Sequence, residues 1–261
     1  MYKKRGKNVM ITGPSSGIGL ELARVFAKKG FDLILVARSK DILELLATEL
    51  RNKYSVNVIV IPKDLADPSA PEKIFSELQE RGTNVDILIN NAGFGLHGPF
   101  ADSDTRVILE MIQVNLVALT HLTKLFLPGM IDRRYGRIMN LGSTSSFVPV
   151  PLEAIYGATK AYILNFSESI SEELVGTGVT VTALCPGFTE TGFFERAKWG
   201  KTNIFKFGVA DARSVAEAGY KALMRRRRVS ITGLNNKALI FSTRFSSRII
   251  VSKLLKYLNQ S

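Results

Sequence analysis

Short runs of β-branched and aliphatic residues alternate with longer amphipathic segments along most of this 261-residue chain, and this alternation limits its possible folds more than any other feature. The runs are apolar at nearly every position, which is typical of strands buried on both faces of a parallel sheet. Parallel strands need crossover connections, and the amphipathic segments can supply them as helices. The sequence therefore predicts a doubly wound α/β fold, with a mostly seven-stranded parallel sheet and helices on both faces.

The expected elements follow one another without a linker rich in proline, glycine or serine and without an internal repeat. We therefore expect a single domain over residues 1–232 and a C-terminal extension over 233–261. The strands are expected at 8–12, 32–37, 56–62, 85–90, 137–141, 180–185 and 229–232, and the helices near 17–29, 40–54, 69–81, 103–134, 155–176 and 211–227.

The formal net charge of +12 is concentrated at the two ends of the chain. Residues 1–7 contain four Lys or Arg, and residues 218–261 contain ten with no Asp or Glu. The remaining 21 basic residues are balanced by all 23 acidic residues of the chain. A nucleic-acid-binding body needs a basic stripe with elements that read bases, so the nearly neutral body argues against nucleic acid as a partner.

Cysteine content and hydropathy indicate the compartment. Cys185 is the only cysteine, so no internal disulfide can form, and we expect a reducing, cytoplasmic environment and a packed thiol. The basic N-terminus lacks the apolar core of a secretory signal. No run reaches the roughly 18 apolar residues of a membrane-spanning helix, so the protein is expected to lie at most on a membrane surface.

A glycine-rich turn, TGPSSGIG, lies between the first expected strand and the first expected helix. Glycines allow the backbone to approach a pyrophosphate closely, and the helix N-terminus behind the turn favours negative charge. The spacing is GxxxGxG rather than the GxGxxG of the standard dinucleotide fingerprint, but its place after the first strand favours a nucleotide site. The expected contacts are Gly13, Ser15, Ser16, Gly17, Ile18 and Gly19.

Residues at the ends of the next strands indicate the kind of nucleotide. Arg38 stands where an NAD site would have an acidic residue, and its guanidinium suits the 2′-phosphate of NADP(H). A solvated arginine is the alternative, and Asp64 could equally be a turn cap. Open α/β sheets bind ligands at the carboxyl ends of their strands, so further contacts are expected from Asp64, Leu65, Asn91, Ala92 and Gly93.

Four polar residues suggest the chemistry. Tyr156 and Lys160 are four apart on an expected helix and share a face, where an ammonium favours the ionised form of a phenol. Such a pair occurs by chance on many helices. Ser143 follows the fifth strand, and Asn115 lies in the long helix 103–134, where an asparagine indicates a local break. Each could be a cap or a surface residue, but together with the glycine turn they predict a catalytic site.

These motifs, in this order, resemble those of the classical short-chain dehydrogenase/reductase family over residues 8–232. The resemblance depends on TGPSSGIG, NNAG, Asn115, Ser143, the segment YGATK that begins at Tyr156, and the segment PGFTET that begins at Pro186. It implies a Rossmann-type fold, no metal, and an enzyme that transfers hydride between NADP(H) and a carbonyl/alcohol pair.

The resemblance also implies roles for individual residues. Tyr156 would exchange the proton and Ser143 would bind the substrate oxygen. Lys160 would hold the nicotinamide ribose and lower the pKa of the tyrosine, and Asn115 would position a water. The nicotinamide contacts would be Pro186, Gly187, Thr189 and Thr191. Family members with NADP(H) often have a second basic residue in the glycine turn, but Ser16 occupies that place here.

Family members also usually pair through the helices that here contain Asn115 and Tyr156, so a homodimer or homotetramer is expected. The segment 192–208 corresponds to their substrate flap, and it contains five aromatic and four basic residues. An apolar flap suits a lipophilic substrate, although its aromatic residues could simply pack on the body. Residues 147–153 should line the same pocket, with His97 at its mouth and His121 in a structural place.

The expected function is therefore reduction of a lipophilic or acyl-chain ketone, 3-oxoacyl-like or steroid-like, by NADP(H). A sugar or polyol dehydrogenase is one alternative, which polar groups in the pocket would favour. A nucleotide-sensing regulator on the same fold is another. Such regulators usually lose the catalytic tyrosine or lysine, and this chain keeps both.

The tail has a helical, basic amphipathic pattern from residue 236 to 258. Phe241, Phe245, Ile249 and Ile250 lie toward one side, whereas Arg244, Arg248, Ser252 and Lys256 recur every four residues on another. A basic cluster at residues 225–228 precedes them. This pattern suits peripheral contact with the anionic inner surface of a membrane, but it does not by itself choose between that partner and the protein. Docking of the apolar side on the body or on a partner subunit is the alternative.

Overall fold

The computed structural model describes residues 8–191 and 209–259, and its central feature is a seven-stranded sheet in the order β3-β2-β1-β4-β5-β6-β9. Every neighbouring pair in this sheet is parallel. The chain runs outward from β1 to β3 and then returns to β4 on the other side of β1, so the doubly wound fold is confirmed. The strands are β1 (Asn8–Thr12), β2 (Asp32–Ala37), β3 (Val58–Pro62), β4 (Ile87–Asn90), β5 (Gly136–Leu141), β6 (Val179–Cys185) and β9 (Val229–Ile231).

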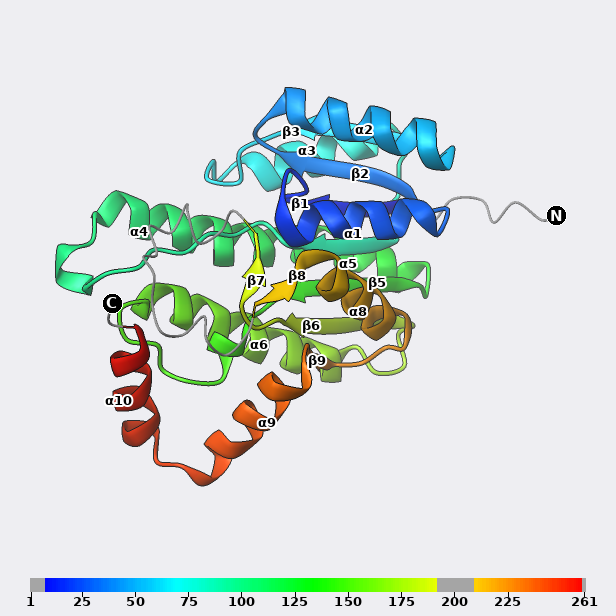
Figure 1. Ribbon diagram of the computed structural model, residues 1–261. Helices are drawn as coiled ribbons and strands as arrows, with labels where there is room; N and C mark the ends of the chain where they lie inside the picture. The colour runs from blue at the N-terminus through cyan, green and yellow to red at the C-terminus, as the bar shows by residue number, and fades with distance from the viewer. Residues whose placement is uncertain (1–7, 192–208, 260–261) are drawn as a thin grey trace.

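Helices cover both faces of this sheet (Figure 1). One layer is formed by α1 (Gly17–Lys28), α2 (Lys40–Tyr54) and α8 (Ala212–Met224). The other is formed by α3 (Ala70–Glu80), α5 (Leu119–Asp132) and α6 (Ala154–Glu173). A short parallel pair, β7 (Thr189–Glu190) and β8 (Ala210–Asp211), was not expected, because two-residue strands leave no periodic pattern in a sequence.

Successive residues of each strand enter two separate hydrophobic cores. Val9 and Ile11 pack with Phe26 in the core under α1, α2 and α8, whereas Met10 between them packs with Leu122 in the core under α3, α5 and α6. Side chains alternate across a strand, so a strand buried on both faces must be apolar at every position. This explains the uniform apolar runs of the sequence.

The expected helix over 103–134 is continuous but irregular. It comprises α4 (Thr105–Ile112), a π-helical turn (Gln113–Ala118) and α5, so the break predicted at Asn115 is confirmed. By length and composition, the helix Thr105–Asp132 could cross a membrane. This differs from the expectation that no segment could do so, which was based on uninterrupted apolar runs. Met111, Leu122 and Phe126 of this helix are buried, and packing of its inner face accounts for its hydropathy.

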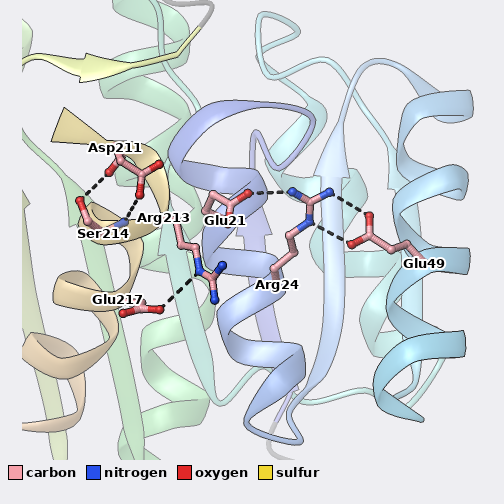
Figure 2. Close-up of polar contacts among 7 residues, drawn as sticks. All are labelled: Glu21, Arg24, Glu49, Asp211, Arg213, Ser214 and Glu217. Carbon is pink, nitrogen blue, oxygen red and sulfur yellow. Dashed lines mark hydrogen bonds and ion pairs between the residues drawn. The ribbon is translucent and has the colours of Figure 1, made fainter. Parts of the chain in front are cut away.

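The solvent side of the first layer is tied by charged groups (Figure 2). Arg24 of α1 donates from Nε and Nη2 to the two carboxylate oxygens of Glu49 on α2, both at 3.0 Å, and from Nη1 to Glu21 at 2.7 Å. The guanidinium holds the pKa of the Glu49 carboxyl below its usual range. Asp211 caps α8 by accepting from the Ser214 amide at 2.9 Å. The Arg24 contacts hold α1, whose N-terminus follows the glycine turn, against α2.

Beyond β9 the chain forms the C-terminal arm, residues 234–259, which projects from the sheet in Figure 1. The arm contains α9 (Leu234–Ser242), a 3-10 turn (Thr243–Phe245) and α10 (Arg248–Asn259). The helical pattern expected to run from residue 236 to 258 is therefore interrupted. Ser246 is extended, and the Ser247 hydroxyl accepts from the Ile249 amide at 3.3 Å, a bond with which serine starts a helix. The four-residue repeat is accordingly divided: Arg244 lies in the 3-10 turn, and Arg248, Ser252 and Lys256 lie in α10.

Candidate active site

A cavity of about 580 Å³ lies at the carboxyl ends of the central strands. Its position agrees with the rule that open α/β sheets bind ligands where the strand order reverses. It brings together all the site residues predicted from the sequence except Gly19 and Asn115, which lie behind its wall. The predicted residues that line it are Gly13, Ser15, Ser16, Gly17, Ile18, Arg38, Asp64, Leu65, Asn91, Ala92, Gly93, Ser143, Tyr156, Lys160, Pro186, Gly187, Thr189 and Thr191.

The glycine turn is packed against the segment after β4. Gly13 has a φ of +68°, and a Cβ atom there would lie 2.9 Å from the Ala92 Cα. A Cβ atom on Gly19 would lie 2.3 Å from both the Gly13 carbonyl oxygen and the Asn91 Nδ2. Neither position can accept a side chain without moving backbone. Gly19 therefore acts through close packing, which explains why it is absent from the cavity wall.

Asn91 holds this turn in place through hydrogen bonds. Its Nδ2 donates to the carbonyl oxygens of Thr12 and Gly13, at 2.8 and 3.0 Å. The Thr12 Oγ1 accepts from the amides of Asn91 and Ala92, both at 3.0 Å. The side chain of Asn91 thus braces the turn, and Thr12 is a site residue that the sequence reasoning missed.

The neighbouring Asn90 points into a buried polar chain below the cavity. Its Nδ2 donates to the Asn140 Oδ1 at 2.9 Å and to the Thr123 Oγ1 at 3.1 Å, and Asn140 in turn donates to the Ser167 Oγ at 2.9 Å. These groups join β4, β5, α5 and α6. Asn90 is the first residue of the NNAG motif, whereas Asn140, a polar residue in the otherwise apolar strand β5, was not among the predicted site residues.

The cofactor end of the cavity fits NADP(H). The N-terminus of α1 directly follows the turn, and Ser16, Gly17 and Ile18 at this end of the helix line the cavity, where a pyrophosphate would be bound. The Arg38 side chain is 68% exposed at the end of β2, and its Nη1 lies 3.9 Å from the Asp64 Oδ2. Ser39 and Lys63 also line the cavity beside Arg38. Lys63 directly precedes the predicted Asp64, and it adds the second cation that the glycine turn lacks.

Ser143 and Tyr156 meet at the other end of the cavity. Tyr156 is 9% exposed and hydrogen-bonds with the Ser143 side chain. The Ser143 Oγ accepts from the Ser145 amide at 3.1 Å, and its own amide donates to the Ser146 Oγ at 3.1 Å. This capping box starts a 3-10 turn (Thr144–Ser146) and fixes the Ser143 hydroxyl beside the phenol.

Burial has the largest effect on the pKa values of Tyr156 and Lys160. It raises the pKa of Tyr156, and the charge of Glu153, one helical turn earlier, raises it further. Burial also lowers the pKa of Lys160 to about 8. Lys160 Nζ donates to the Leu141 carbonyl at 2.7 Å and lies 5.5 Å from the centre of the Tyr156 ring. The expected lowering of the Tyr156 pKa by Lys160 is thus not met in this structure, because loss of water around the phenol has the larger effect.

Asn115 lies behind the cavity, in the π-helical turn. Its Oδ1 accepts from the Phe94 amide at 3.1 Å, and its Nδ2 donates to the Phe94 carbonyl at 2.9 Å and to the Thr159 Oγ1 at 3.2 Å. The side chain therefore joins the segment after β4 to α6. Its amide group is already bonded to protein, so the structure assigns it a bracing contact.

The described residues form part of the substrate side of the cavity. Phe94, Val114 and Phe188 line the cavity with apolar atoms, and Glu110 adds one carboxylate. The expected flap, 192–208, lies outside the described residues.

Residues 147–153 were expected to line the same pocket, and this is wrong. The capped turn after Ser143 carries the chain away from the cavity, and Phe147 to Val150 border a separate hollow with α6 and Arg248.

Neither His97 nor His121 is among the residues that line the cavity. His97 is half-buried and hydrogen-bonds with the backbone of Asn259, and burial lowers its pKa. His97 is thus in contact with the end of α10. His121 Nε2 lies 3.6 Å from Glu72 Oε1, between α5 and α3, in agreement with the structural place expected for it.

The family model of the short chain dehydrogenases matches residues 7–201. This chain belongs to that family. It is accordingly an oxidoreductase that acts on the CH–OH or ketone group of a small-molecule substrate, and its Rossmann-type fold is the fold of the family.

Two curated relatives illustrate the range of similarity. A ketoacyl reductase, HetN, of Nostoc is 32% identical over 231 residues, which are 88% of this chain and 79% of the relative. A human very-long-chain 3-oxoacyl-CoA reductase is 37% identical over 190 residues, which are 71% of this chain. The match spans only 60% of the human protein.

Solved structures give the same fold over nearly the whole chain. A short-chain dehydrogenase from Sphingobium yanoikuyae, in complex with NADPH, is 34% identical with a TM-score of 0.83, and the match covers 94% of this chain and 95% of that one. A ketone-specific alcohol dehydrogenase from Comamonas testosteroni is 30% identical with a TM-score of 0.77, covering 92% of each chain.

Proposed function

We propose that this protein is an NADP(H)-dependent reductase of a lipophilic, acyl-chain ketone of the 3-oxoacyl or steroid kind, and that Tyr156 donates the proton. The observation that carries the proposal is the buried phenol of Tyr156, hydrogen-bonded to Ser143 at one end of a cavity whose other end is a nucleotide-binding turn. Because burial raises its pKa, Tyr156 holds its proton at neutral pH, as a donor must.

NADPH supplies a hydride to the carbonyl carbon when it is bound in the cavity. The Ser143 hydroxyl orients the substrate oxygen beside the phenol, and Tyr156 transfers its proton to that oxygen as negative charge develops there. Lys160 holds the ribose hydroxyls and stabilises the phenolate that remains after transfer. Asn115 keeps α6 and the segment after β4 at their separation through its bonds to Phe94 and Thr159. The water-positioning role expected for Asn115 stays a prediction.

Preference for NADP(H) is supported by Arg38 and Lys63 at the adenosine end. The apolar lining by Phe94, Val114 and Phe188 supports a lipophilic substrate. The two curated relatives described above, a ketoacyl reductase and a 3-oxoacyl-CoA reductase, support an acyl chain. Glu110 is the one observation in favour of a sugar or polyol substrate, because a carboxylate can accept hydrogen bonds from hydroxyl groups.

We further propose a homo-oligomer in the cytoplasm. The helices that usually form the subunit contact expose apolar side chains here, Leu109 on α4, Val117 on the π-helical turn and Tyr162 on α6. Their exposure supports pairing through this surface. The single buried Cys185 is in keeping with a reducing compartment.

The test is NADPH oxidation with a panel of 3-oxoacyl thioesters, steroid ketones, aldehydes and sugars. Tyr156→Phe removes only the hydroxyl, so we expect turnover of the best substrate to fall by about 10²–10⁴-fold while NADPH affinity is retained. A Tyr156→Phe protein with more than about a tenth of the wild-type rate would contradict the proton-donor role. A clear preference for sugars would instead favour the Glu110-based alternative.

A further inference from the structure

We propose that the C-terminal arm binds an anionic lipid surface and presents the substrate side of the enzyme to it. Of the sixteen large apolar side chains that are exposed in the described part of the chain, eight belong to this arm of 26 residues. They are Leu234, Leu239, Phe241, Phe245, Ile249, Ile250, Leu254 and Tyr257. A monomeric protein seldom exposes so much apolar surface in one element unless something covers it.

The three stripes of α10 show how this surface is organised. Val251, Leu255 and Leu258, spaced by four and three residues, are half-buried and face the body. The next stripe around the helix, Ile250, Leu254 and Tyr257, is 55–70% exposed. Beyond it lies the stripe Ile249, Lys253 and Lys256, which is also exposed. One apolar stripe is enough to dock the helix on its own body, so the second has a different partner.

The aromatic residues of the arm extend this surface. Phe241 is 59% exposed and Phe245 is 79% exposed, and their ring centres lie 5.3 Å apart. Both rings thus contact each other while they remain largely outside the protein. Such aromatic side chains are typical of helices that lie in the interface of a bilayer.

The positive charge of the arm favours an anionic lipid surface over a second copy of the arm as its partner. Lys237, Arg244, Arg248, Lys253 and Lys256 are all exposed, and the arm contains no Asp or Glu. None of the five forms an ion pair with any residue in the described ranges. Two arms packed face to face would bring ten cations together with no anion between them. An anionic headgroup layer supplies the missing charge.

The ends of the arm connect this surface to the active site. At the start of α9, Asn236 packs so closely on the cavity residue Gly187 that a Cβ atom there would lie 2.4 Å from its Nδ2. At the end of α10, the fully buried Asn259 donates to the Pro151 carbonyl at 3.1 Å. The arm is therefore held at both ends by segments that flank Ser143 and Tyr156. Delivery of a lipophilic substrate from the bilayer rests on the proposed function. Binding of the arm to the lipid surface does not depend on that function.

The experiment is sedimentation of the full-length protein with vesicles of phosphatidylcholine alone or with phosphatidylglycerol added. We expect binding to the anionic vesicles at low salt, and loss of that binding at high salt or with phosphatidylcholine alone. Lys253→Gln combined with Lys256→Gln should weaken binding by about 30-fold, which corresponds to about 1 kcal/mol for each cation. Ile250→Ser with Leu254→Ser should weaken it by at least as much.

Two matched controls lie on the body. Leu45→Ser removes an exposed leucine of α2, and Arg106→Gln removes an exposed cation at the start of α4. Both should bind vesicles like the wild type. Turnover of a water-soluble ketone should be unchanged in every variant, so failure of the proposed function is detected separately.

The proposal is overturned if the wild type stays in the supernatant with anionic vesicles at low salt, or if the controls lose as much binding as the arm variants. It is also overturned if Ile250→Ser with Leu254→Ser converts an oligomer to a monomer and leaves vesicle binding intact. The arm would then be a subunit contact.

Discussion

The glycine turn and the C-terminal arm both border the active site, but they are built from opposite kinds of surface. In the turn, the polar groups of Thr12, Gly13 and Asn91 bond to one another, and no room remains for an added methyl group on Gly19. The arm contains half of the exposed large apolar side chains of the described residues, beside cations that form no ion pair within those residues. Precise backbone geometry is needed where phosphates bind, whereas a lipid surface requires only a pattern of residue types. The two regions should therefore respond differently to substitution.

Gly19→Ala should give the largest effect, because it tests the packed region directly. The added methyl group would lie 2.3 Å from backbone and from the Asn91 side chain, so the turn must open. We expect a loss of about 3 kcal/mol or more in unfolding free energy, measured with urea, and loss of measurable NADPH binding by fluorescence titration.

Gly129→Ala is the matched control, because Gly129 is also in a helix and the nearest atom to its added methyl is the flexible end of Arg133. Equal losses in the two variants would show that the turn is no more tightly packed than an ordinary helix.

Glu153→Gln probes the buried start of α6, two residues after Pro151, which accepts the hydrogen bond from Asn259 of the arm. Burial raises the pKa of the Glu153 carboxyl to about 8, against 4.5 for an ordinary glutamate. Between these values the folded protein keeps a proton that the unfolded chain has lost, so the unfolding free energy of the wild type falls as the pH rises from 4.5 to 8. Each unit of difference corresponds to about 1.4 kcal/mol.

The Gln variant should match the wild type near pH 4.5 and exceed it by a few kcal/mol at pH 8, in urea unfolding at each pH. Glu80→Gln, at an exposed position of α3, is the control. A constant difference between variant and wild type across this range would show that Glu153 does not ionise as its burial requires.

Arg38→Ala should give the smallest effect, because its side chain is largely exposed and bonds through charge rather than packing. A charged hydrogen bond contributes about 1.5–3 kcal/mol, so NADPH affinity should fall by about 10- to 100-fold while NADH affinity stays the same. Lys63→Ala should act in the same direction. Equal dissociation constants of the wild type for the two cofactors would remove the basis for NADP(H) preference.

Local patterns were enough to predict the main sheet, most of the helices and a set of site residues of which all but Gly19 and Asn115 line the cavity. The strands around Val9 and Ile34 are apolar because each residue is buried, and the motif residues follow strands whose ends must meet at one edge. What escaped prediction depends on contacts between distant segments. The Asn91 brace, Lys63 beside Arg38 and Asn259 beside Pro151 join residues brought together only by the fold. The break at Ser246 was visible as a serine pair, but the four-residue repeat of cations obscured it.

The reactivity of the buried Cys185 thiol reports how often the structure around it opens. The thiol is fully buried at the end of β6, and burial raises its pKa to about 12. Reagents that react with thiolates must therefore wait until the sheet opens around it. As the chain has no second cysteine, the labelling rate of the native enzyme reports a single event, the opening of the sheet around the end of β6. Any ligand that binds only the closed form slows that rate in proportion to its occupancy, so the affinity of a colourless substrate can be read from the rate of thiol labelling.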